Sequence, residues 1–155
     1  MPKLTINENN RGFTDEFKVT FTDFLSAQAG TIADDTAKTF TYAAPAGTVV
    51  TKAGFKLVTA FNDSGSGDDL GVTVGVSGGD VDGFVASTAI HTDDYPVTYA
   101  YNSGALLDNE DQHIFQSAGD ILITFTPNVD ADASYSLNEL TAGEIVFKFE
   151  LSDLN

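Results

Sequence analysis

The stretch EIVFKFEL, residues 144–151, places apolar side chains at every second position. The spaced residues are Ile145, Phe147, Phe149 and Leu151. Successive side chains of a β-strand point to opposite faces, so this spacing gathers the four apolar groups on one face. Phe and Ile also pack well on a pleated surface. The stretch therefore predicts a strand with one buried face.

The same period of two recurs along most of the chain. The further runs are Phe17–Val19–Phe21, Phe40–Tyr42, Phe55–Leu57, Val72–Val74–Val76, Val97–Tyr99–Tyr101 and Ile121–Ile123–Phe125. Clusters of Gly, Pro, Asn and Asp separate the runs and are typical of turns. Eight or so strands, with no helix longer than a turn or two, predict an all-β fold. We expect a single antiparallel β-sandwich, jelly-roll-like, with these apolar residues as its core.

Two segments lack this pattern. Residues 24–37 predict either a short helix or an irregular crossover. Residues 1–16 predict an extended N-terminal arm, ahead of a sandwich domain at 17–155. The arm is either a frayed terminus or a segment that docks on a neighbour by strand addition. In the second case the candidate partner-binding residues are Lys3, Leu4, Ile6, Arg11 and Phe13.

Length and composition favour one self-sufficient domain. The chain has 155 residues, 12 Phe and no Cys, so it can bury a core but cannot form disulfides or thiolate metal sites. No repeat or linker indicates a second domain. The N-terminus lacks the apolar region of a signal peptide, and no apolar run approaches the roughly 18 residues that span a bilayer. We expect neither export by that route nor a membrane partner.

The charge is strongly negative and unevenly distributed. The formal net charge is −16, and residues 57–147 contain no Lys or Arg but 15 Asp and Glu. Nucleic-acid affinity comes largely from Lys and Arg, so the pattern excludes a nucleic-acid partner. The acidic surface serves either solubility or attraction to a basic partner.

An acidic, glycine-rich stretch, NDSGSGDDLGVTVGVSGGDVDGF at residues 62–84, resembles a calcium site at first sight. The EF-hand pattern fails, because Gly83 at position 6 puts Gly78 at position 1 and Ala89 at position 12. The calcium-binding nonapeptide pattern also fails, because Val81 takes the place of its third Gly and Gly83 that of its Asp. That pattern must also repeat along the chain, whereas this stretch occurs once. We expect no metal and interpret the acids as turns around a strand. An irregular site stays open, using either Asp63, Asp68 and Asp69 or Asp80 and Asp82.

No catalytic pattern survives comparison with the known ones. The histidines are His91 and His113, and no G-x-S-x-G or phosphate-binding loop occurs. Carboxylates are too numerous for any pair to indicate glycoside hydrolysis. We therefore expect no enzyme and no cofactor. A sugar-binding module stays open, with Tyr95, Tyr99 and Tyr101 as stacking platforms.

Two blocks resemble a known family. They are AAPAGTVVTKAGFKLVTAFNDSGSGDDLGVTVG at 43–75 and ITFTPNVDADASYSLNELTAGEIVFKFELSDL at 123–154. Over roughly residues 30–155, the order and general residue character of these blocks resemble those of the capsid decoration or cement proteins of tailed bacteriophages. The resemblance implies a β-sandwich that binds the outside of an icosahedral head, commonly as a trimer, and staples neighbouring capsomers.

The resemblance and the residue patterns together predict a viral structural protein. Its expected partners are the major capsid protein and further copies of itself, in a homo-oligomer that we expect to be a trimer. We expect it on the capsid exterior of the virion after synthesis in the host cytoplasm. The alternative is a tail or head-fibre domain that binds a host-surface glycan. A third possibility is a lectin-like or metal-dependent adhesion module.

Overall fold

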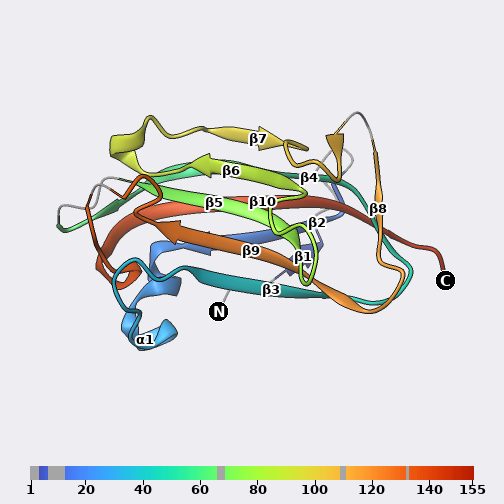
Figure 1. The fold of residues 1–155 in the computed structure, drawn as a ribbon, viewed down its shortest axis with the longest axis horizontal. Helices are drawn as coiled ribbons and strands as arrows, with labels where there is room; N and C mark the ends of the chain where they lie inside the picture. Colours follow the sequence, from blue (N-terminus) through green and yellow to red (C-terminus); the bar gives the residue numbers. More distant parts are fainter. Residues whose placement is uncertain (1–3, 7–12, 66–68, 109–110, 132) are drawn as a thin grey trace.

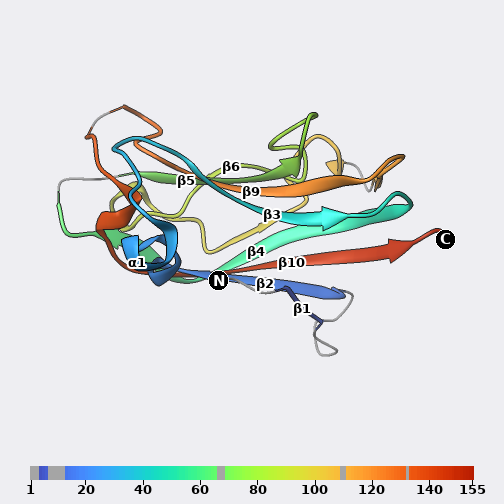
Figure 2. The same ribbon diagram turned by 90° about the horizontal axis from the view of Figure 1, so that it is seen from below.

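The structure, a computed structural model, describes residues 4–6, 13–65, 69–108, 111–131 and 133–155. Two antiparallel sheets face each other as the layers of a β-sandwich (Figures 1 and 2). The all-β sandwich predicted from the sequence is therefore confirmed. None of the described residues forms a helix long and apolar enough to cross a membrane.

Sheet A has six strands. Its order is β1 (Leu4–Ile6), β2 (Asp15–Thr20), β10 (Leu140–Asp153), β4 (Thr48–Asp63) and β7 (Tyr99–Tyr101), with β8 (His113–Ile114) also paired to β4. Sheet B has four strands. Its order is β3 (Lys38–Ala44), β9 (Gly119–Pro127), β5 (Leu70–Val76) and β6 (Val85–Ala89).

The strand order is jelly-roll-like. When β1 and β8 are set aside, the first strand pairs with the last, β2 with β10, and the next pairs are β3 with β9, β4 with β7 and β5 with β6. This nested pairing is that of one long hairpin rolled into two sheets. It brings together residues far apart in the sequence, such as Phe17 and Phe147, which are register partners.

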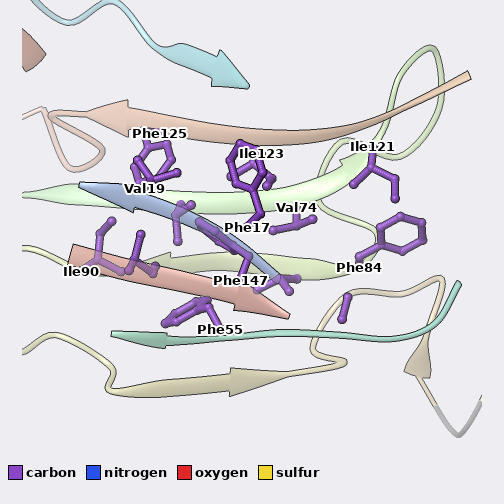
Figure 3. Packing of buried hydrophobic residues seen from close by; sticks show 14 of the residues in the cluster. Phe17, Val19, Phe55, Val74, Phe84, Ile90, Ile121, Ile123, Phe125 and Phe147 are labelled. Atoms are coloured by element: carbon purple, nitrogen blue, oxygen red, sulfur yellow. The ribbon is translucent and has the colours of Figure 1, made fainter. Parts of the chain in front are cut away.

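The core lies between the sheets, where the alternating residues meet (Figure 3). Phe125 of β9 lies at its centre, with ring centroids 4.9 Å from Phe24 and 6.0 Å from Phe147. The predicted runs on β2, β4, β5, β9 and β10 supply much of this core. Phe24, Phe61, Phe84 and Tyr135 are also buried there, although no run marked them.

One predicted core run was wrong. Val97, Tyr99 and Tyr101 are exposed large hydrophobic residues. In the register of β7 on β4, Ala100 lies opposite Phe55, whereas Tyr99 and Tyr101 flank it. Because side chains alternate between faces, Ala100 points into the core and both tyrosines point to solvent.

The uncertain segment 24–37 contains short helical turns. These are η1 (Phe21–Phe24) and α1 (Ser26–Ala29), and an irregular crossover then leads to β3. Further helical turns among the described residues are η2 (Thr92–Asp94) and η4 (Leu137–Glu139). The Asn138 side chain in η4 fixes the crossover, since its amide donates to the Phe24 carbonyl at 2.6 Å and its oxygen accepts from the Ile32 N–H at 2.7 Å.

Candidate partner interface

The predicted arm is described only in part. Lys3 and Arg11 lie outside the described residues. Leu4 and Ile6 belong to β1, which pairs antiparallel with β2 of the same chain through Leu4 opposite Phe17 and Ile6 opposite Asp15. β2 begins at Asp15, so the sandwich includes the last two residues assigned to the arm. A role of the arm in partner binding stays a prediction.

Of the five candidate partner-binding residues, Phe13 is the one whose side chain is described, and it lies over sheet A. Its ring meets Tyr101 of β7 edge-to-face at a centroid distance of 6.2 Å. The contact joins the start of β2 to the opposite edge of the sheet. It also marks the side of sheet A that faces away from the core.

We call this side the outer A face. It carries the side chains that alternate with buried residues on β2, β4, β7 and β10. The charged and aromatic residues among them are Glu16, Lys18, Lys52, Lys56, Tyr99, Tyr101, Glu144, Lys148 and Glu150. Four of the seven basic residues of the chain thus gather on one surface.

Ion pairs across strands organise this face. Lys18 Nζ lies 2.8 Å from Glu144 Oε1, and Lys52 Nζ lies 2.9 Å from Glu150 Oε2. The Thr51 hydroxyl donates to Glu150 at 2.5 Å, and this bond together with Lys52 lowers the pKa of Glu150. Such exposed pairs add little to stability, but they leave the face electrically balanced.

The near-neutral charge of the outer A face contrasts with the strongly negative charge of the rest of the molecule. Four lysines and three glutamates give the outer A face a formal charge of +1. The whole chain carries −16, so all other residues together carry −17. An approaching acidic or neutral protein surface therefore meets the least repulsion at the outer A face.

An aromatic cleft opens on this face between β7, β4 and the start of β2. Its volume is about 250 Å³, and it is lined by Phe13, Gly54, Phe55, Lys56, Tyr99, Ala100, Tyr101 and Lys148. Tyr99 is 66% exposed and Tyr101 is 55% exposed. A Cβ at Gly54 would lie 2.5 Å from the Ala100 carbonyl oxygen, so glycine permits the close pairing of β4 with β7.

Of the acidic stretch at 62–84, the structure describes the end of β4 at Asp63, the strand β5 and the turn after it, which holds Asp80 and Asp82 as expected. Asp63 and Asp69 are nearly buried, and their carboxylates accept backbone N–H groups. Gly65 donates to Asp63 at 2.9 Å, and Val129 donates to Asp69 at 2.8 Å. Among the residues that the structure describes, no three His, Asp or Glu side chains are grouped as metal ligands. Asp68 lies outside them.

Asp80 and Asp82 share a hydrogen bond, which raises the pKa of Asp82. The nearby negative charge of Asp80 acts in the same direction, because like charges disfavour ionisation. Both residues lie in the turn after β5.

The two histidines have different environments. His91 is fully buried, with Nε2 3.3 Å from Asp63 Oδ1 and Nδ1 accepting the Asp93 N–H at 3.3 Å. Nδ1 thus bonds within the segment that connects β6 to β7, whereas Nε2 meets the last residue of β4. His113 packs against Phe84 and Phe115 at centroid distances of 5.5 and 4.9 Å, and burial lowers its pKa.

Comparisons with known proteins yield one weak likeness. No family model matches the chain, and no curated protein matches it. Among solved structures it is similar to a chain of the acidic stable capsid structure of Helicobacter pylori bacteriophage KHP30. The identity is 14% and the TM-score 0.38, over 90% of this chain and 98% of the other. A likeness of this size carries no argument about function.

Proposed function

We propose that the chain is a non-catalytic accessory protein of a tailed-bacteriophage capsid. It binds the outside of the assembled head and cements neighbouring capsomers, with the major capsid protein as its partner. The proposal extends the sequence resemblance and assigns the docking role to the outer A face. It also places the protein on the virion exterior, after synthesis in the host cytoplasm.

The observation that carries the proposal is the contrast between the outer A face and the other surfaces. That face has a charge of +1 and two exposed tyrosines, whereas the remaining residues carry −17. Tyrosine is enriched in the energetic centres of protein interfaces, because it buries a large area at a small entropic cost. The acidic remainder would face solvent and repel other virions and free nucleic acid.

Cementing requires added contact area and no chemistry. One protomer docked through a single face binds weakly, but several linked protomers bind with a high effective concentration. A trimer on a symmetric shell would bind through three weak contacts at once and would therefore dissociate much more slowly than one protomer. This is why the proposal includes the homotrimer that the sequence resemblance implies.

The test is co-sedimentation of the purified protein with heads that lack it. The Tyr99→Ser/Tyr101→Ser double variant should bind heads about 30-fold more weakly, since the loss of interface aromatics costs about 2 kcal/mol. The matched control is Tyr95→Ser, because Tyr95 is 94% exposed and lies outside the cleft. Equal binding by the double variant and the wild type would contradict docking through the outer A face.

A second candidate function follows from the same cleft. Exposed Tyr99 and Tyr101 beside Lys56 also suit a sugar ring, which supports the alternative of a fibre domain that binds a host glycan. Copy number separates the two functions. A cement protein occupies many symmetric positions on the head, whereas a fibre domain is present in few copies and binds a glycan array.

A further inference from the structure

The edge strand β3 has the usual protections of a sheet edge only at its two ends. It pairs with β9 over seven residues in unbroken register, from Lys38 opposite Phe125 to Ala44 opposite Gly119. No described strand pairs with its other side. Proteins normally guard such an edge with charges, Pro, bulges or short length. Lys38 begins β3 and Pro45 follows it, but Thr39–Ala44 between them contains no charged residue and no Pro.

The other edges are less suited to accept a strand. β1 and β7, at the edges of sheet A, have three residues each. β6, at the far edge of sheet B, has five residues and an irregular register on β5. The backbone N–H and C=O groups along β3 thus form the longest regular edge in the described part of the chain.

A cleft of about 310 Å³ lies beside the first half of β3. Its lining residues are Phe17, Asp23, Gln28, Ala29, Lys38, Thr39, Phe40 and Thr41. Phe17 and Phe40 come from opposite sheets, with ring centroids 6.1 Å apart. Phe17 is buried, whereas Phe40 is half-buried and brings apolar surface to the cleft. Because residues of η1 and α1 form the other wall, the cleft suits a single extended segment better than a second folded domain.

We propose that this edge and cleft accept the N-terminal arm of a neighbouring copy, with Leu4–Ile6 added to sheet B as a fifth strand. On its own chain this segment pairs with β2 through three register partners, and β3 offers an edge of seven residues, long enough to pair the whole segment and its flanking residues. Leu4 and Ile6 are two residues apart, the spacing of strand residues that share a face. An added strand gains backbone hydrogen bonds and places alternate side chains against the cleft.

Charge favours the same occupant. Residues 1–14 contain Lys3 and Arg11 against Glu8, a net charge of +1. Residues 15–155 carry −17, so each body repels its neighbours while it attracts their arms. A contact between the arm of one copy and the edge of the next is head-to-tail, and such contacts close into a ring when the rotation allows. The inference deepens the proposed function, because it supplies the contact that would link the protomers.

The absence of cysteine allows a direct test by disulfide trapping in the free protein. Thr5→Cys is combined in turn with Thr39→Cys, Thr41→Cys or Ala43→Cys, three exposed positions along β3. After mild oxidation of the folded protein, at least one pair should give disulfide-linked multimers up to trimers on non-reducing gels. Thermal melts before oxidation establish that each variant is folded.

Two further double-cysteine variants serve as controls. Thr5→Cys/Glu16→Cys joins register partners of β1 and β2, so it reports the arm on its own chain. Thr5→Cys/Thr73→Cys places the second thiol on the inner strand β5 and should not cross-link. Linked multimers from the β3 positions alone support the inference. Monomers at all three β3 positions, or equal linkage at Thr73, would overturn it.

The outcome is independent of head binding. If trapping fails while the tyrosine variants still lose head binding, only the strand exchange is wrong. If trapping succeeds while the protein binds no head, only the proposed function is wrong.

Discussion

Phe125 is the residue whose truncation should most clearly measure the sandwich core. Its side chain is fully buried on β9. Four phenylalanine rings surround it at centroid distances between 4.9 and 6.0 Å: Phe24, Phe40, Phe61 and Phe147. They come from both sheets and from η1. Phe125→Ala therefore removes one ring from contacts that join three parts of the fold.

The expected loss is about 3–5 kcal/mol of the free energy of unfolding, from lost transfer energy and the cavity that remains. At an unfolding entropy of about 2.1 cal/mol/K per residue, a chain of this length should melt about 9–15 °C lower. Calorimetry and urea unfolding measure both quantities. The matched control is Tyr99→Ala, which should change stability by no more than about 0.5 kcal/mol, because Tyr99 is exposed. Equal losses in the two variants would refute the assignment of inner and outer faces.

Three further predictions test local features. Gly143→Ala should lower the free energy of unfolding in urea more than Gly78→Ala does. Both glycines have positive φ, but a Cβ at Gly143 would lie 2.2 Å from the Phe61 ring, whereas a Cβ at Gly78 would have no described atom within 4 Å apart from its chain neighbours; equal losses would contradict this packing. Burial lowers the pKa of His113, so its contribution to stability is present above its unfolded pKa of about 6.5 and is lost as the pH falls through the lower folded value. His113→Phe should therefore flatten the change in the urea midpoint between about pH 7 and pH 5, and an unchanged profile would argue against that environment. Millimolar calcium should leave the melting temperature unchanged, because Asp63 and Asp69 already accept backbone N–H groups; a rise of several degrees would favour the adhesion-module alternative.

Alternation predicted most of the sandwich because each strand buries one face. Ile145, Phe147 and Phe149 lie in the core as expected, and the nested strand order follows from rolling such strands into two layers. The same rule failed at β7, where a small Ala100 takes the inner position between two tyrosines. Alternation separates the side chains of a strand into two faces, but it does not say which face is buried when the solvent-facing side chains are aromatic, as Tyr99 and Tyr101 are.

Several buried aromatics could not be found from local patterns. Phe24 reaches the core from a helical turn, and Phe84 lies just ahead of β6. Their burial depends on how the sheets stack, which is a long-range property. The buried pair of His91 and Asp63 is of the same kind, since 28 residues separate the partners.

The outer A face could be recognised only from the strand order. Its lysines are spread from Lys18 to Lys148 in the sequence, and β2, β4 and β10 become neighbours through long-range pairing. The net charge of the chain was readable from composition, but the separation into a balanced face and an acidic remainder was not.

The most direct test of the proposed function is electron cryomicroscopy of tailed-phage heads that lack this protein, from the phage to which the proposal assigns the chain, after saturation with the purified protein. The account predicts density at symmetric positions outside the shell, with β4, β7 and β10 of sheet A toward the capsid protein and sheet B toward solvent. Density in which sheet B or the acidic turns contact the shell, or saturated heads with no added density, would contradict it.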